Sequence, residues 1–152
     1  MTDRALADRG ARIVAQTIFD RPLLLEAGAG TGKTTTLVAR ALSWCIGPGW
    51  EEAALRLEGA EPHKIAADVL QGVVAITFTE AAAAEMAARI AESLASVVDG
   101  REGDIRGLEP ETLEALGSAT RRRRAEMLLE TFDHLTVSTI HSFCFSLLTD
   151  HP

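Results

Sequence analysis

Glycine, lysine and threonine residues crowd into one short segment, and these residue types at this spacing can hold a polyphosphate. The segment fits the Walker A pattern except that its first position is alanine. Glycines let the backbone turn tightly, so that successive N–H groups point at phosphate oxygens, and the N-terminus of a following helix adds positive potential. The residues predicted to contact the polyphosphate are Ala27, Gly28, Ala29, Gly30, Thr31, Gly32, Lys33, Thr34 and Thr35.

Two of these side chains are predicted to take a direct part in chemistry. Lys33 can reach the β- and γ-phosphates of ATP, and the Thr34 hydroxyl can ligate Mg²⁺, so ATP and Mg²⁺ are the expected cofactors. The alternative is a glycine-rich turn that only joins a strand to a helix. Such a turn needs neither a lysine nor a threonine at these positions, so the sequence favours a phosphate-binding loop.

The segments around this loop are those expected of an α/β fold. Apolar and β-branched runs predict buried strands, and periodic apolar residues predict helices. Their alternation predicts a parallel sheet flanked by helices, and three strands leave that sheet incomplete. Pro62 interrupts residues 50–71, which we interpret as loop with some helix. Strands are expected at 23–26, 73–79 and 135–138, and helices at about 3–18, 33–46, 80–98, 118–132 and 140–148.

Composition sets broad limits on the class of protein. The chain has 152 residues, of which 47% are hydrophobic, enough for the core of one domain. The net charge of −7 neither supports nor excludes nucleic acid, because a local basic groove can bind phosphates on an acidic protein. The sequence contains neither an apolar run of about 18 residues nor a signal-peptide core, so we expect a cytoplasmic protein without a membrane partner.

The two cysteines lie far apart in the sequence, outside any Cys/His cluster. Cys45 and Cys144 both fall on apolar faces of predicted helices. We expect buried, reduced thiols rather than a disulfide or a metal site.

Two further segments indicate more than a phosphate-binding loop. Residues 75–86 resemble motif Ia of superfamily-one helicases, and residues 138–144 resemble their motif Ib. With the phosphate loop as motif I, the three segments occur in the order of that family. The chain therefore resembles the UvrD/RecB/AddA group. Glu26, Glu80 and the Phe143-Cys144 pair look more like RecB and AddA, the motor subunits of helicase–nucleases that process broken double-stranded ends.

The resemblance implies contacts to single-stranded DNA from both later motifs. A phenyl ring offers a stacking face to any base, and hydroxyls donate to phosphates. For Phe78 the alternative is an ordinary core residue, and for the His141-Ser142 pair it is a helix-capping arrangement. No aspartate partner marks that pair as a hydrolase site. The implied DNA contacts are Thr77, Phe78, Thr79, Thr139, His141 and Ser142.

Two other features leave their roles open. The family usually has a glutamine ahead of the phosphate loop that recognises adenine. Gln16 is the upstream candidate, but it lies nearer the loop than the UvrD-type spacing, where Arg12 falls. Residues 121–124 are four consecutive arginines, which point all round a helix, so a solvated helix face is favoured over a DNA-binding patch.

The resemblance implies that residues 1–152 are the N-terminal portion of a RecA-like, P-loop NTPase domain. The whole protein would be an ATP-dependent DNA helicase or helicase–nuclease that translocates on single-stranded DNA in repair or recombination. Its expected partners are single-stranded DNA or duplex ends, the remaining domains of the same motor, and a nuclease or second helicase subunit.

Hydrolysis by this fold needs an aspartate for Mg²⁺ and a glutamate that orients water. No apolar strand ending in Asp-Glu occurs in the sequence. We therefore expect this chain to bind Mg·ATP weakly and neither to hydrolyse it nor to unwind DNA. The alternatives are a P-loop NTPase or kinase unrelated to helicases, and a non-catalytic nucleotide-binding fragment.

Overall fold

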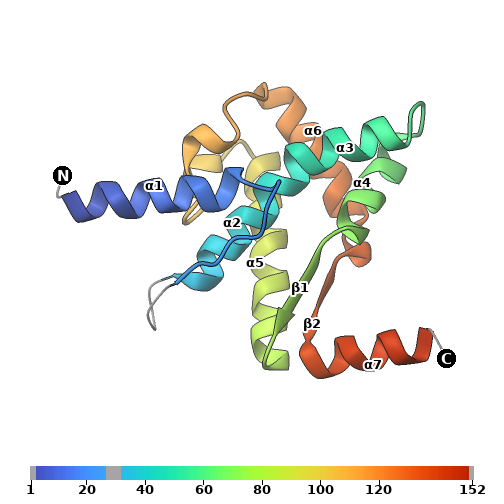
Figure 1. Ribbon diagram of the computed structural model, residues 1–152. Helices are drawn as coiled ribbons and strands as arrows, with labels where there is room; N and C mark the ends of the chain where they lie inside the picture. The colour runs from blue at the N-terminus through green and yellow to red at the C-terminus, as the bar shows by residue number, and fades with distance from the viewer. Residues whose placement is uncertain (1–2, 27–31, 151–152) are drawn as a thin grey trace.

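The computed structural model describes residues 3–26 and 32–150, and helices predominate in it (Figure 1). Side chains are described from Asp8 to Glu26 and from Gly32 to Thr149. Three short 3₁₀ turns, η1 (Glu102–Asp104), η2 (Pro110–Thr112) and η3 (Phe132–His134), join the longer elements. Those elements are α1 (Asp3–Thr17), α2 (Lys33–Ile46), α3 (Pro48–Arg56), α4 (Pro62–Gln71), β1 (Val74–Thr77), α5 (Glu80–Val98), α6 (Ser118–Glu130), β2 (Thr136–Thr139) and α7 (Ile140–Asp150).

The two described strands form a parallel pair, as the alternation of strands and helices predicts. Their register runs from Val74 opposite Thr136 to Thr77 opposite Thr139. Parallel neighbours need a crossover connection, and here α5 and α6 supply it. Both strands lie beside α5 and end next to the starts of α5 and α7 (Figure 1). The α/β class is therefore confirmed, with a much larger helical share than expected.

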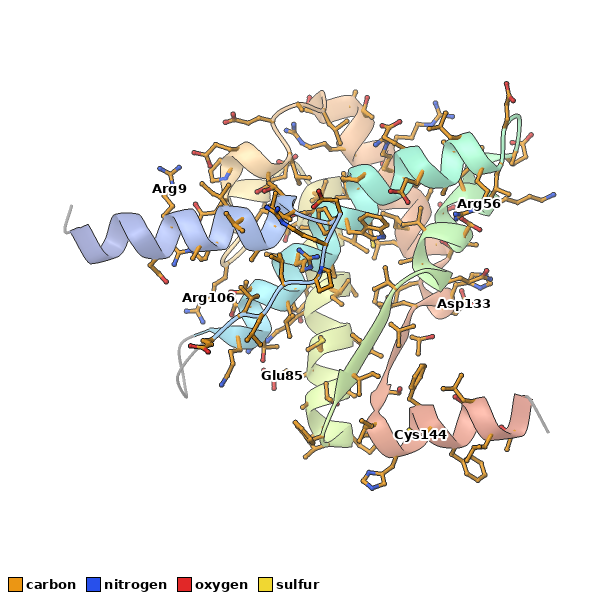
Figure 2. All side chains as sticks on the ribbon, in the orientation of Figure 1. Arg9, Arg56, Glu85, Arg106, Asp133 and Cys144 are labelled. Atoms are coloured by element: carbon orange, nitrogen blue, oxygen red, sulfur yellow. The ribbon has the colours of Figure 1, made fainter. Side chains whose placement is uncertain are left out.

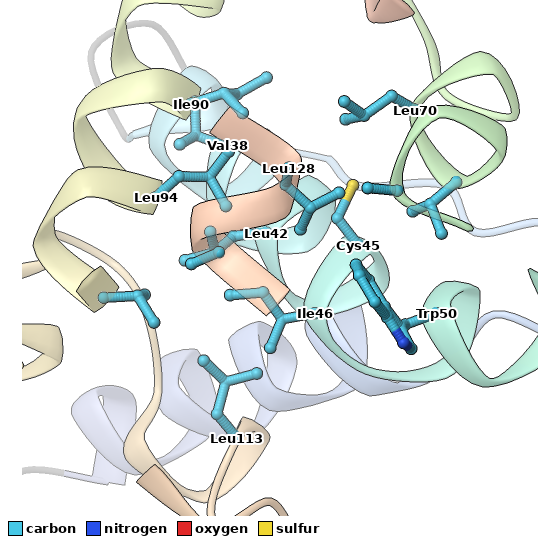
Figure 3. Packing of buried hydrophobic residues seen from close by; sticks show 14 of the residues in the cluster. Val38, Leu42, Cys45, Ile46, Trp50, Leu70, Ile90, Leu94, Leu113 and Leu128 are labelled. Atoms are coloured by element: carbon cyan, nitrogen blue, oxygen red, sulfur yellow. The ribbon is translucent and has the colours of Figure 1, made fainter. Parts of the chain in front are cut away.

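The core surrounds α2, which lies between the other helices (Figure 3). Leu42 and Ile46 of α2 are fully buried, and they meet Leu94 of α5 and Leu128 of α6 within one apolar cluster. The predicted helices 33–46 and 80–98 are found with these bounds. An apolar stripe at helical spacing has to face a partner helix, which is why periodicity located them correctly.

The predicted strand at residues 23–26 is absent from the structure. These residues are irregular, and Leu24 is 86% exposed. A strand exists through hydrogen bonds to a neighbour, and β1 and β2 pair with each other. The described sheet therefore has two strands instead of the three expected.

Residues 50–71, interpreted from the sequence as loop with some helix, are mostly helical. Most of that segment belongs to α3 and α4, each of which has a proline in its first turn. Proline is tolerated at that position because the first N–H groups of a helix have no intrahelical acceptor. Pro62 therefore begins a helix instead of interrupting one.

The two cysteines differ in their environment. Cys45 is buried in the core, and burial raises the pKa of its thiol to about 12. Cys144 lies on an exposed face of α7, so its predicted burial is wrong. Its helix is apolar in sequence but packs mainly against the two-stranded sheet among the described elements. Within the described ranges, no helix combines the length and apolar character that a membrane crossing requires.

Arg40 fixes α1 against α2. Its guanidinium donates from Nη1 to the carbonyl oxygens of Ala15 (2.5 Å) and Ile18 (2.8 Å), at the end of α1. The same group lies 4.4 Å from the centre of the Phe19 ring. Carbonyls at a helix C-terminus lack intrahelical partners, so a cation is favoured there. This contact places α1 next to the helix that follows the phosphate loop.

Candidate functional site

The glycine that ends the predicted phosphate loop adopts the conformation such a loop requires. Gly32 has a φ of 88°, in the left-handed region that favours glycine, and precedes α2 directly. Its carbonyl accepts hydrogen bonds from the backbone N–H (2.9 Å) and the hydroxyl (3.2 Å) of Thr36. Lys33 is exposed and Thr34 half-buried in the first turn of α2. The predicted contacts Ala27, Gly28, Ala29, Gly30 and Thr31 lie outside the described residues.

A loop outside the three motifs packs on the start of α2. This segment, loop 105–109, joins η1 to η2 and has Gly107 at its middle, with a φ of +81°. A Cβ atom built on Gly107 would lie 2.5 Å from Cγ2 of Thr35. The close approach therefore also requires glycine. Nothing in the sequence marks this loop, because it belongs to a polar stretch without a motif.

Loop 105–109 is one wall of a hollow of about 510 Å³ beside the first turn of α2, here called the α2 hollow. Arg12 of α1 and Gly32, Thr35 and Thr36 also line it. Small-molecule sites in proteins typically have about 300–1,000 Å³. The α2 hollow is therefore large enough for part of a nucleotide, next to the predicted phosphate site.

Gln16 holds loop 105–109 against α1. Its side chain is fully buried, and Nε2 donates to the carbonyl oxygen of Gly107 (2.7 Å). Oε1 accepts from the backbone N–H of Glu109 (3.0 Å) and the hydroxyl of Thr112 (3.2 Å). Both lone pairs of the amide oxygen are thus occupied. The upstream glutamine positions a loop in this structure and offers no exposed edge to a base.

Glu109 forms a second link between this loop and α1. Its carboxylate accepts from Nε of Arg12 (2.7 Å) and from Nε of Arg9 (3.1 Å). Burial alone would raise the pKa of Glu109, but the hydrogen bonds from Arg12 and Arg9 outweigh burial and hold that pKa below 4.5. The carboxylate therefore stays ionised at neutral pH.

Glu109→Gln is expected to lower the free energy of unfolding at pH 7 by about 1 kcal/mol, because both arginine partners are partly exposed. Since folding lowers the pKa of Glu109, its contribution is complete above pH 4.5 and is lost as the pH falls through the folded-state value. Urea denaturation at pH 7 and pH 3 measures the difference between the two proteins. A difference of equal size at both pH values would contradict this role of the carboxylate.

The ends of β1 and β2 bring together residues that are far apart in the sequence. Thr77 lies opposite Thr139 in the register, and Phe78 follows β1 directly. Phe78 is 92% exposed, which excludes its interpretation as a core residue. β1 ends at Thr77, and the next side chain therefore lies beyond the sheet.

The hydroxyls of Thr77 and Thr79 have local partners. Thr77 is nearly buried, and its Oγ1 donates to the carbonyl oxygen of Thr79 (3.0 Å). Oγ1 of Thr79 accepts from the backbone N–H of Ala82 (3.1 Å) and caps α5. These bonds fix the turn on which Phe78 is presented.

Glu80 joins the two later motifs. Its Oε1 lies 3.1 Å from Oγ1 of Thr139 and 3.2 Å from Oγ of Ser142, and the two hydroxyls are 3.0 Å apart. The backbone N–H of Ser142 donates to Oγ1 of Thr139 (3.2 Å). Thr139 therefore caps α7. The sequence-based alternative to a DNA contact had instead assigned helix capping to the His141-Ser142 pair. His141 is exposed in the first turn of that helix.

The run of four arginines is only partly a solvated face. Nη1 of Arg124 donates to the carbonyl oxygen of Ile46 (2.7 Å), and its guanidinium lies 5.5 Å from the centre of the Trp50 ring. Nε of Arg121 donates to Glu102 (3.1 Å). Arg122 and Arg123 are exposed. The expected solvated face is thus correct for two of the four, because α6 packs two of its arginines against neighbouring elements.

Comparison with known proteins agrees with this arrangement of motifs. The model of the UvrD/REP helicase N-terminal domain family matches residues 9–152. The chain is 31% identical over 137 residues to an ATP-dependent helicase/nuclease subunit of Desulforamulus reducens, covering 90% of this chain and 8% of that protein. The corresponding helicase/nuclease protein of Moorella thermoacetica is 36% identical over 126 residues, 83% of this chain and 6% of that protein.

A differently named relative shows the same pattern. The RecBCD enzyme subunit RecB of Escherichia coli is 33% identical over 128 residues, 82% of this chain and 10% of RecB. No solved structure matches the chain. The chain thus spans a tenth or less of the length of these relatives. Because the family model covers nearly all of it, the chain belongs to the UvrD/REP helicase N-terminal domain family.

Proposed function

We propose that this chain is the nucleotide-binding front part of an ATP-driven DNA helicase or helicase–nuclease. The observation that carries the proposal is the common location of three helix starts (Figure 1). The N-terminal ends of α2, α5 and α7, which lie within motifs I, Ia and Ib, are all on the same side of the molecule (Figure 1). In open α/β sheets, ligands bind at the carboxyl ends of the strands. One side of the molecule thus presents both candidate sites.

In this proposal ATP binds at the start of α2. Lys33 would contact the β- and γ-phosphates, and Thr34 would hold Mg²⁺, which neutralises phosphate charge when bound. The Thr34 hydroxyl would be a suitable Mg²⁺ ligand because it lies in the first turn of α2, close to Gly32 and the proposed phosphate site. The positive end of the α2 dipole supports the same anion. The residues of this chain bind and orient the nucleotide, and the carboxylates for hydrolysis would come from further polypeptide.

We also propose a RecA-like fold for the complete domain. The edge of β1 that faces away from β2 borders an apolar groove of about 440 Å³, lined by Leu37 and Trp44 of α2 and by β1 itself. Val74 and Ile76 are exposed beside it. Additional strands placed there would cover these side chains and extend the sheet, and single-stranded DNA and the other domains of the motor would bind to the completed unit.

Single-stranded DNA is proposed to bind at the ends of β1 and β2. Phe78 offers an exposed ring there, while Thr79 and His141 are exposed on the adjacent first turns of α5 and α7. Base stacking on an aromatic ring contributes about 1–3 kcal/mol. Glu80 ties motif Ia to motif Ib, so both surfaces would contact one strand as a unit.

Phe78→Ala is expected to weaken binding of a fluorescein-labelled oligo(dT) by about tenfold, because one stacking platform is removed. Fluorescence anisotropy at fixed salt measures the dissociation constant. Phe145→Ala is the matched control, since Phe145 is 70% exposed and lies outside both motifs. Equal losses of oligo(dT) affinity in the two variants would indicate non-specific hydrophobic binding and contradict the role of Phe78 as a base-stacking residue.

The second candidate function is a P-loop NTPase or kinase that does not act on DNA. It accounts for Gly32, Lys33 and Thr34 but gives no role to the exposed Phe78 or the Glu80 network. The two proposals differ in a direct test on this chain. A DNA motor requires Lys33-dependent nucleotide binding together with Phe78-dependent oligonucleotide binding, whereas Lys33-dependent nucleotide binding without any DNA binding would favour the second candidate.

A further inference from the structure

Two arginines face the α2 hollow, and only one of them is neutralised. Arg12 is paired with Glu109 at 2.7 Å and with Asp8. Arg106 is exposed and has neither an ion pair nor a hydrogen bond to any residue that the structure describes. Glu109, the carboxylate in the hollow, is already occupied by Arg9 and Arg12. Arg106 is therefore the cation in this hollow that is available to a ligand.

The contacts of loop 105–109 hold the backbone at Arg106 in place. Loop 105–109 is held by the bonds of Gln16 to Gly107 and Glu109, and Gly107 packs on Thr35. Arg106 extends from this loop beside the N-terminal part of α2 (Figure 2). It also borders a second hollow, lined by Thr35 and by Glu92 and Ser96 of α5. A rigid support with a long cationic side chain is suited to contact a ligand bound at the start of α2.

The geometry assigns the nucleoside half of the nucleotide to the α2 hollow, with Arg106 as the residue that contacts it. This inference rests on the proposed function, because it requires the triphosphate to bind at Gly32 and Lys33. Thr35 and Thr36 lead directly from that position into the hollow. The sugar hydroxyls and the base ring nitrogens are hydrogen-bond acceptors, and a guanidinium has five donors and also stacks on flat rings.

The assignment predicts that Arg106 distinguishes a nucleotide from a bare polyphosphate. Arg106→Ala is expected to weaken Mg·ATP binding about tenfold, and to leave the affinity for Mg·tripolyphosphate unchanged. The dissociation constants are measured by isothermal titration calorimetry, with circular dichroism and thermal melting as tests of folding. Arg106→Lys should restore only part of the ATP affinity, because ammonium lacks the planar fork of donors.

Arg123→Ala is the matched control, since Arg123 is an exposed arginine on α6 that does not line the α2 hollow. Equal losses for ATP and tripolyphosphate in Arg106→Ala would overturn the assignment and place Arg106 at the phosphates. An unchanged ATP affinity would overturn it as well. Failure of the proposed function has a different signature, in which Lys33→Ala binds both ligands as tightly as the original chain.

Discussion

Replacing Lys33 with alanine is expected to lower the affinity of the chain for Mg·ATP by about 100-fold. Hydrogen bonds between an ammonium and phosphate oxygens are charge-assisted and stronger than neutral ones. The position at the N-terminus of α2 adds the helix dipole to the same field. Since Lys33 is exposed and outside the core, the circular dichroism spectrum should stay the same.

A fluorescent ATP analogue titrated in the presence of Mg²⁺ measures this loss. The chain contains one other lysine, Lys64, which is exposed on α4 and serves as the matched control. Lys64→Ala should bind the analogue like the original chain. If Lys33→Ala also binds normally while remaining folded, the start of α2 is not the phosphate site.

Gly107→Ala is expected to lower the free energy of unfolding by about 2–3 kcal/mol and to weaken nucleotide binding. Two effects add at this position. A φ of +81° costs a residue with a Cβ about 1–2 kcal/mol. In addition, the new Cβ would lie 2.5 Å from Thr35 Cγ2, so either loop 105–109 or the first turn of α2 has to move.

Gly59 separates these two effects. It has nearly the same backbone conformation, with a φ of +79°, but a Cβ there meets nothing within 4 Å. Gly59→Ala should therefore cost only the backbone contribution, about 1 kcal/mol, and leave nucleotide affinity unchanged. Urea denaturation and the ATP titration compare the pair. Equal losses of unfolding free energy and of ATP affinity in both variants would mean that the close contact between Gly107 and Thr35 has no effect on either.

The sequence was sufficient for features that depend on local spacing. The apolar stripes of residues 33–46 and 80–98 located α2 and α5, since apolar residues at helical spacing form one face of a helix, and in these two helices that face contributes to the core. The β-branched run near Val74 located β1. The family was likewise evident from three short motifs, because each motif is one continuous segment whose residue types and order can be compared directly with those of the family.

Features that depend on distant partners were decided only by the tertiary structure. Residues 23–26 have the composition of a strand, but they have no strand pairing in the described part of the chain. Cys144 sits on an apolar helix whose face is exposed because little packs against it. Whether a side chain is buried or a strand is paired depends on a second segment that packs against the first. The residue pattern of one segment does not identify that second segment.

The candidate nucleotide site likewise combines residues that the sequence predicted with residues that only the structure revealed. Gly32, Lys33 and Thr34 could be predicted as phosphate contacts from the sequence, since the proposed phosphate-binding loop is one continuous segment. Loop 105–109 could not, because Gln16 reaches Gly107 and Glu109 across more than 90 residues of sequence. Bringing two segments together over that separation costs conformational entropy, and the many contacts of the folded chain offset this cost together. The position of Arg106 beside α2 therefore became visible only in the tertiary structure.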